Sequence, residues 1–514
     1  MVALWIGRIA LASSVVLPLL GGTVGRSRRG RSACVPLSWA AAAAAALVVL
    51  GVVVAHGPDA LSVRGGPGLV ADPVSAVVLL LVTGVGAVVQ SFSVRYLQAD
   101  PSSGRFAGRV GAVVTAMTLV AASADLVGLA VGWTVAGVAF LGVLSCRNDL
   151  PGVAGCSRAL RRALVVGDGC LLAATALVLD RAGDVQLGSA HALELAVRQL
   201  GPWHGVVAVL VTVAALARGA QGIFSRWLPR TISAPTPACA LLHAGVVNGG
   251  GVLLVRTGAL GAWGPAMVGL LVVSGATAVR ASLIMRRQAD VKGKLAYSTM
   301  AQMGFMLSEC AVGAYPAAVI HLVAHGCYKA SLFFSSGSAV RRPGRPTTTS
   351  TVPAPVLTTA AMALAAVVAV VPGLVIGDGA VLAAFAAVTA ASLAAAVGSS
   401  LSVGPGSGRG RWSMLLFAAA AGYGSLVAVV GRFLAHGAVA VAGSTVDPWW
   451  LVAGAIVAAV AAWTAERSRW AGALRGWLLD AGCPRATTGE PLRRPGANVP
   501  ADASCALAVE GKAA

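Results

Sequence analysis

The chain has 514 residues, of which 57% are hydrophobic and only 11% are charged, and its mean hydropathy is +0.83. A soluble domain carries about 25% charged residues, so this composition leaves too little polar surface for a water-soluble protein. A disordered chain is also excluded, because it would be poor in apolar residues and rich in charge. The remaining class is a polytopic membrane protein, since a membrane-spanning helix needs about 20 apolar residues.

Fifteen apolar runs predict fifteen transmembrane helices, so the fold class we expect is an all-α polytopic membrane protein. Each run is continuous and rich in Ala, Leu and Val, whereas a membrane barrel strand alternates apolar and polar residues over about ten positions. We expect the first run to be a retained helix and not a cleaved signal peptide. The expected spans are 2–21, 35–56, 69–91, 108–124, 126–146, 160–180, 203–220, 236–256, 262–285, 294–314, 316–340, 354–374, 378–398, 412–434 and 448–466.

The net charge of +20 is carried mostly by arginine, because only four of the 38 basic residues are lysines. The arginines cluster in alternate loops, which is typical of the cytoplasmic loops of membrane proteins. The intervening loops carry almost no cations, apart from the longer segment 181–202. We therefore expect a multi-pass protein of the cell membrane, with its N-terminus outside and its C-terminus in the cytoplasm.

The basic residues do not predict a nucleic-acid-binding protein, because none of their clusters is interleaved with aromatic residues. The nine cysteines are scattered and form no CxxC pair. They therefore predict neither a disulfide framework nor a zinc or iron–sulfur site.

Three regions are expected along the chain. Residues 1–466 form the predicted membrane domain. Residues 467–483 predict an amphipathic helix at the membrane interface, because Trp470 and Trp477 lie at helical spacing among basic residues. Residues 484–514 are polar and rich in Pro and Gly, which predicts a disordered cytoplasmic tail.

Lys329 is the first candidate for function, because ionisable residues inside a span are costly and usually functional. It is the only lysine in the interior of a predicted span, and it follows His321 and His325 at positions i, i+4 and i+8. On a helix this spacing places the three side chains on one face, over about 12 Å. The row predicts a proton relay, since amine and imidazole groups both accept and release protons. The alternative is that the histidines make helix-packing hydrogen bonds and Lys329 snorkels to the interface.

His243 is the second candidate, because the sequence around it breaks a helix. Pro235 and Pro237 precede it, and Asn248 with three glycines follows it. Irregular backbone at membrane depth is tolerated where it lines a wet cavity. The glycine run is not a dinucleotide-binding fingerprint, because no strand precedes it.

Three further ionisable residues lie in predicted spans. Asp168 is mid-span, Arg218 lies near the cytoplasmic end of its span, and Glu309 lies toward the outer end of the tenth span. Each is a functional candidate by the same reasoning. Each could instead be a solvated helix end.

Three segments then carry a resemblance to a known family: PTPACALLHAGVVNGGGVLLVR, DVKGKLAYSTMAQMGFML and AAVIHLVAHGCYKASLFFSSGS. They resemble, in order, the antiporter-like proton-translocating subunits of respiratory complex I and of Mrp antiporters. Upstream, VADPVSAVVLLLVTGVGAVVQSFSVRYLQADPSSGRF is similar to the third span of that family, so the resemblance covers about residues 70–345. Within the superfamily, HAGVVNGGG and HLVAHGCYKASLF most resemble the DabB-type subunits of two-component inorganic-carbon transporters.

The resemblance implies roles for particular residues. The family's lysine and histidine relay matches Lys329, His321 and His325, and its broken-helix histidine matches His243. The residues expected to translocate protons are therefore Lys329, His325, His321, His243, Arg218, Asp168 and Glu309.

Two positions depart from the family pattern. Arg218 stands where the family has a lysine in its seventh span, and Thr134 replaces the glutamate of a GWE motif. Arginine cannot pass a proton by deprotonating. We therefore expect no Glu–Lys pair, and the missing lysine in spans twelve to fourteen makes the family's lateral proton path incomplete.

The function expected from these observations is that of a membrane proton-conducting subunit in an energy-coupled uptake complex for bicarbonate or CO₂. The resemblance implies a partner, a large peripheral zinc-dependent DabA-type protein that resembles carbonic anhydrase. No His or Cys of this chain falls at zinc-ligand spacing, so we expect a transport subunit without cofactor or metal. The ion could be H⁺ or Na⁺. The alternatives are a divergent subunit L-like member of an NADH–quinone oxidoreductase, or a related cation/proton antiporter.

Overall fold

A computed structural model describes residues 2–27, 33–54, 68–147, 152–288 and 290–336, all within one unit, Met1–Cys483. Four predicted spans (354–374, 378–398, 412–434 and 448–466), the predicted helix 467–483 and the predicted tail 484–514 lie outside the described residues.

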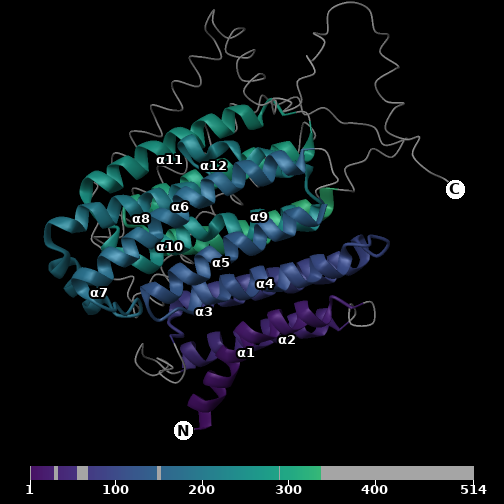
Figure 1. Cartoon of the computed structure of the whole chain (residues 1–514), viewed down its shortest axis with the longest axis horizontal. Helices are drawn as coiled ribbons and strands as arrows, with labels where there is room; N and C mark the ends of the chain where they lie inside the picture. Colours follow the sequence, from purple (N-terminus) through teal and green to yellow (C-terminus); the bar gives the residue numbers. More distant parts are fainter. Residues whose placement is uncertain (1, 28–32, 55–67, 148–151, 289, 337–514) are drawn as a thin grey trace, which may run out of the picture. The chain divides into compact units, whose positions relative to one another are not determined.

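The expected all-α fold is confirmed over the described residues, whose long helices run side by side (Figure 1). Their α-helices are α1 (Val2–Val24), α2 (Cys34–Val54), α3 (Pro73–Tyr96), α4 (Ser103–Ala122), α5 (Leu126–Leu144), α6 (Val153–Ala182), α7 (Ala190–Leu200), α8 (His204–Arg218), α9 (Thr236–Ala244), α10 (Gly249–Thr257), α11 (Gly264–Met285), α12 (Val291–Ala311) and α13 (Tyr315–Ser335). Short 3₁₀ helices are η1 (Ser145–Arg147), η2 (Gly201–Trp203), η3 (Gly222–Arg226), η4 (Leu228–Ser233), η5 (Val246–Asn248) and η6 (Gly258–Leu260).

Ten helical segments of the described residues are long and apolar enough to cross a membrane, which supports a multi-pass membrane protein. Helix α12 is not among them, although we expected a span at 294–314. It has 21 residues but carries Lys292, Lys294 and Glu309, and it packs against α11 and α13. A helix of 21 residues is about 31 Å long, enough to cross the apolar core of a bilayer. The count of fifteen spans and the orientation of the termini stay predictions.

The segment 181–202, which we expected to be a loop, contains the short helix α7. Leu193, Ala196 and Leu200 recur at helical spacing and are buried, while the opposite face is polar. The Ser189 hydroxyl accepts a hydrogen bond from the Ala192 N–H and caps the helix. Eleven residues cannot cross a bilayer, so α7 lies against the other helices as a surface element.

Helices α1 and α4 approach each other closely where both carry glycine. A Cβ atom at Gly22 would lie 3.0 Å from the Gly108 carbonyl oxygen, and one at Gly111 would overlap the Pro18 carbonyl oxygen. Helix α4 packs in turn against α3 and α5. Small residues therefore bring the backbones together, which stabilises helix packing inside a membrane.

The backbone breaks at two places that position the candidate residues. Helix α8 ends at Arg218, and Ala220 adopts a left-handed conformation with φ 57°. The Gln221 side-chain amide then donates hydrogen bonds to the Gly219 and Met300 carbonyls, so backbone oxygens at the break are satisfied. The second break, between α9 and α10, begins at Gly245 and continues as η5. The prediction of a broken helix around His243 is confirmed, although Pro235 and Pro237 start α9 and do not interrupt a longer helix.

Candidate functional site

The first group of polar side chains joins α12 to α13. Glu309 is fully buried, and its Oε2 lies 3.0 Å from His321 Nδ1. His321 Nε2 lies 2.9 Å from the Gln302 side-chain oxygen. If both nitrogens of His321 carry a proton, the ring donates to Glu309 and to Gln302. If only Nδ1 carries a proton, a rotated Gln302 amide can instead donate its N–H to Nε2. Glu309 is therefore a paired interior residue and not a solvated helix end.

Lys329 lies on the same face of α13 and is also buried. It is 1% exposed, and its Nζ donates to the Leu295 carbonyl oxygen at 3.3 Å. The amine therefore does not snorkel to an interface. Lys329 lies about one turn beyond His325, which is the middle residue of α13.

His325 and His243 meet where α13 crosses the broken helix. His325 is buried and hydrogen-bonded to the backbone of His243, and a Cβ atom at the adjacent Gly326 would lie 2.9 Å from the Ala244 carbonyl oxygen. The centroids of the His325 and His321 rings are 6.1 Å apart. The expected row of His321, His325 and Lys329 therefore lies on one face of α13, and this face packs against α9 and α12.

The His243 ring leaves one nitrogen available for a proton. Its Nε2 lies 3.3 Å from the Thr231 hydroxyl, whose own proton is donated to the Leu228 carbonyl at 2.6 Å. Nε2 is thus the donor of this contact, and Nδ1 has no hydrogen-bond partner although it is buried. The ring stacks on Phe333 with a centroid separation of 4.5 Å, which fixes its orientation.

A second group joins α5, α6 and α8. The Asp168 Oδ1 atom accepts hydrogen bonds from Arg218 Nη2 at 2.9 Å and from Trp133 Nε1 at 2.8 Å. The guanidinium carbon of Arg218 lies 4.2 Å from the centroid of the Trp133 ring, and Arg218 Nη2 also donates to the Trp133 carbonyl at 3.0 Å. All three residues are buried, so neither Asp168 nor Arg218 is a solvated helix end.

The expected absence of a Glu–Lys pair does not leave Arg218 alone. Thr134, which stands at the family's glutamate position, donates a hydrogen bond to the Ala130 carbonyl within its own helix. Arg218 is nevertheless paired, because Asp168 reaches it from the middle of α6. The register of α6 against α8 decides this pairing, and that register is not visible in the order of residues along the chain.

The broken helix connects the two groups. A Cβ atom at Gly249, the first residue of α10, would lie 3.3 Å from both Arg218 Cγ and the Trp133 ring. His243, at the other side of the break, faces the α13 row. The seven expected site residues therefore lie in two buried clusters on either side of η5.

Comparison with known proteins identifies the family of this chain. Residues 123–401 match the family model described as "NADH:quinone oxidoreductase/Mrp antiporter, TM", and residues 65–107 match "NADH-Ubiquinone oxidoreductase (complex I), chain 5 N-terminus". The chain belongs to the NADH:quinone oxidoreductase/Mrp antiporter family.

Curated relatives within this family point to the DabB-type branch. The chain is 34% identical over 277 residues to the probable inorganic carbon transporter subunit DabB1 of Halothiobacillus neapolitanus, covering 53% of this chain and 50% of that one. It is 34% identical over 274 residues to the corresponding DabB of Bacillus subtilis, covering 53% and 54%. The chain thus matches about half the length of these relatives.

A solved structure of an Mrp complex from Dietzia supports the same fold. One of its chains superposes with a TM-score of 0.56 and 26% identity, over 94% of this chain and 52% of that chain. The antiporter-like fold expected from the sequence is therefore confirmed for this family member.

Several polar residues that the structure places at or beside the two clusters, or in a further buried pair, were not among the sequence candidates. Trp133 belongs to the cluster of Asp168 and Arg218, and Gln302 belongs to the cluster of Glu309 and His321. Neither Trp nor Gln is unusual in an apolar span, so nothing in the sequence selected them. Asp72 and Arg256 form a separate buried ion pair, in which Arg256 also donates to the Ser123 carbonyl. The sequence signal for this pair was Arg256 itself, which lies near the end of an apolar run and has no acidic residue on its own helix α10.

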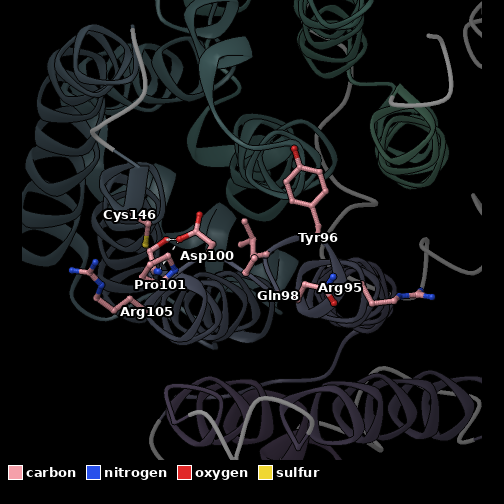
Figure 2. Close-up of a pocket in the computed structure, with 10 residues that line it drawn as sticks. Arg95, Tyr96, Gln98, Asp100, Pro101, Arg105 and Cys146 are labelled. Carbon is pink, nitrogen blue, oxygen red and sulfur yellow. Dashed lines mark hydrogen bonds between the residues drawn. The ribbon is translucent and has the colours of Figure 1, made fainter. Parts of the chain in front are cut away.

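A surface pocket of about 740 Å³ lies at the connection of α3 and α4, and its lining residues are drawn in Figure 2. Arg95 and Arg105 extend to opposite sides, so their charges do not converge on one ligand. Burial raises the pKa of the Cys146 thiol at its edge, and the Arg109 guanidinium acts in the opposite direction. None of the expected site residues lines the pocket. Among the described residues, no three His, Cys, Asp or Glu side chains gather as a metal site.

Proposed function

We propose that this chain is the membrane, proton-conducting subunit of an energy-coupled complex that takes up inorganic carbon as bicarbonate or CO₂. The observation that carries the proposal is the buried row of His321, His325 and Lys329 on α13, together with Glu309 of α12, which is in direct contact with His321. Buried ionisable groups in a membrane span are expensive and typically mark ion or proton pathways. In this proposal Lys329 is the central proton carrier, and His243 receives or supplies its proton across the broken helix.

Unpartnered polar atoms in both clusters and at the break between them support a hydrated path. His243 Nδ1, His325 Nε2, Asn248 Oδ1, Glu309 Oε1 and Arg218 Nε are buried and have no protein partner. Such atoms are ordinarily satisfied by ordered water. Water molecules at these atoms would connect the titratable groups that do not touch one another.

The assignment to carbon uptake is supported by the relatives, which are named as inorganic carbon transporter subunits. The partner in this proposal is a large peripheral zinc-dependent protein of the DabA type, which performs the hydration chemistry. This chain would supply the energy by letting H⁺ move down its gradient, so it would be a transport subunit and not an enzyme.

The competing proposal is a subunit of an NADH–quinone oxidoreductase or a cation/proton antiporter, since the family model covers both. The pairing of Arg218 with Asp168 favours neither, because an ion pair serves conduction in any of these complexes. Affinity purification of the full chain from its native membrane separates them. A co-purifying soluble zinc protein supports carbon uptake, whereas a set of respiratory subunits contradicts it.

Growth of a carbonic-anhydrase-deficient cell in air tests the function directly. We expect the full chain together with its co-purifying partner to restore growth, and each protein alone to fail. The physical reason is that this chain offers a proton path and the partner offers the chemistry, and neither replaces the other. Growth with this chain alone would contradict the proposed role of a subunit. If the pair fails although both proteins reach the membrane, the carbon-uptake assignment is wrong.

A further inference from the structure

Thr231 connects the η4 turn to the His243 ring. The residue is buried, and its hydroxyl donates to the Leu228 carbonyl at 2.6 Å, three residues back in the same turn. The hydroxyl proton is therefore committed to the backbone, and the oxygen faces His243 Nε2 at 3.3 Å as an acceptor. The Cys239 thiol contacts the Thr231 carbonyl at 3.2 Å, which ties η4 to α9. Thr231 thus offers the ring a lone pair from a fixed position.

The contact with Thr231 selects one of the two neutral forms of His243. A neutral histidine ring carries one proton on its two nitrogens. Because the partner of Nε2 is an acceptor, the proton belongs on Nε2, and Nδ1 is left bare, buried and without a protein partner. Turning the ring over would break this contact, and the ring is fully buried and stacked on Phe333. The orientation and the tautomer are therefore set together.

The His243 ring lies at the level of Lys329 on α13. His325 is hydrogen-bonded to the His243 backbone, and Phe333 stacks on the His243 ring. Lys329 lies between these two contacts, about one turn from each. It is close enough for its charge to act on the ring. The turns on either side of Lys329 thus hold His243 beside the amine.

We infer that Thr231 is a positioning residue that holds His243 in the Nε2–H tautomer, so that the ring takes up and returns its proton at Nδ1 alone. In the loading step the Lys329 ammonium gives a proton to Nδ1, directly or through one water molecule. An N–H bond of the lysine breaks, an N–H bond of the ring forms, and the positive charge moves to the ring. Return of the proton reverses these changes. This inference rests on the proposed function and adds to it a residue on η4.

A ring fixed in this way stores a proton and does not pass it through. A through-relay accepts a proton at one nitrogen and releases the other proton from the second nitrogen, so the group beyond that nitrogen has to carry it onward. Beyond Nε2 stands the Thr231 hydroxyl, and beyond the hydroxyl stands the Leu228 carbonyl. A peptide carbonyl is not basic enough to hold a proton. His243 is thus a side branch of the path at Lys329.

The tautomer is measured by ¹⁵N NMR on the full chain labelled at histidine and purified with its partner. The signal that disappears in His243→Gln belongs to His243, and we expect it to show Nε2 protonated and Nδ1 bare at neutral pH. Thr231→Val removes the acceptor and keeps the shape. The ratio of the Nε2–H form to the Nδ1–H form should fall about fivefold, the factor that one net hydrogen bond contributes to an equilibrium. Thr231→Ser should restore the wild-type ratio.

Proton flux gives the functional half of the test. The same preparation is reconstituted in liposomes with an imposed pH gradient. Thr231→Val should lower the flux by about fivefold, in step with the tautomer ratio, and Thr231→Ser should keep it. Thr175→Val is the matched control, because Thr175 is also buried and its hydroxyl donates to the Leu171 carbonyl of its own helix at 2.9 Å. This variant loses the same kind of hydrogen bond and should keep wild-type flux.

Four outcomes decide the inference. A wild-type His243 ring protonated on Nδ1 would overturn it, as would wild-type flux in Thr231→Val. An equal loss of flux in Thr175→Val would also overturn it, because the loss of any buried hydroxyl would then explain the result. If Thr231→Val fails to insert, the tautomer in the wild-type chain and in Thr231→Ser decides. If the wild-type chain conducts no protons, the proposed function fails, and the NMR ratios still show whether Thr231 fixes the ring.

Discussion

At the scale of single residues, Lys329 is the side chain whose presence packing explains least. Its amine has one hydrogen bond, to the Leu295 carbonyl, and is almost fully buried. Placing a charged amine in the bilayer interior costs about 2.5–3.5 kcal/mol on insertion scales. Methionine would fill the same space without this cost, so a lysine at this position requires a functional reason.

Three substitutions of Lys329 should separate a proton carrier from a structural residue. Lys329→Ala should abolish transport, because no titratable group remains there. Lys329→Arg should also be severely impaired, since arginine keeps the charge but cannot release a proton. Lys329→Met should insert normally and be inactive. Growth that depends on carbon uptake and membrane abundance are measured for each variant.

Lys294→Met is the control for these variants, because Lys294 is exposed at the start of α12. It should keep wild-type growth. Wild-type activity in Lys329→Arg would show that Lys329 is a fixed charge. A loss of abundance in Lys329→Met would show that the lysine is structural.

At the scale of helices, the buried pair of Asp72 and Arg256 holds together elements that are distant in sequence. Asp72 caps α3 by accepting the Ser75 N–H, and its other oxygen binds Arg256 of α10. Arg256 also donates to the Ser123 carbonyl at the end of α4. One arginine thus joins the ends of three helices, one of which is half of the broken helix.

Breaking this pair should destabilise the protein without touching the α13 row. Asp72→Asn keeps the helix cap but leaves the Arg256 charge buried without its partner, which typically costs about 3–5 kcal/mol. We expect a clear fall in the midpoint of thermal aggregation in detergent. The double variant Asp72→Asn, Arg256→Leu should recover part of the loss, because no unpaired charge remains.

The exposed pair of Asp180 and Arg181 provides the control for that experiment. Its side chains are 67% and 47% exposed, and exposed pairs contribute about 0–1 kcal/mol. Asp180→Asn should therefore leave the midpoint nearly unchanged. Equal midpoints for Asp72→Asn and Asp180→Asn would show that the buried pair contributes little.

At the scale of the whole molecule, the orientation depends on every span being counted. Helix α12 falls outside the ten clearly apolar segments, and the alternation of arginine clusters requires it to cross the membrane. It is as long as α13 and packs between α11 and α13. Its polarity is explained by its place in the site, since it supplies Glu309, Gln302 and the Leu295 carbonyl to α13.

Reporter fusions test this orientation. A reporter after residue 514 should be cytoplasmic, and one inserted in the loop 57–68 should be outside, because positive loops stay in the cytoplasm. Activity of paired reporters that work on only one side of the membrane is the measurement. A fusion in the loop between α3 and α4, which is flanked by Arg95 and Arg105, is the internal reference, and we expect it in the cytoplasm. The opposite result after residue 514 or in the loop 57–68 would reject the prediction of fifteen spans.

The sequence alone was sufficient to predict the membrane class, the approximate positions of the long helices among the described residues, and the row on α13. Each depends on properties that are local along the chain: the length of an apolar run, the spacing of His321, His325 and Lys329, and the helix-breaking residues near His243. Helix α7 was missed because eleven amphipathic residues carry too little signal between spans.

Only the tertiary structure decided which polar groups meet. Glu309 faces His321, Asp168 faces Arg218, and Asp72 faces Arg256, and each pair joins different helices. Contacts of this kind depend on the rotation and register of one helix against another, and packing across the whole bundle sets both. A charged residue inside an apolar run indicates that a partner is needed, but the fold determines which side chain is that partner.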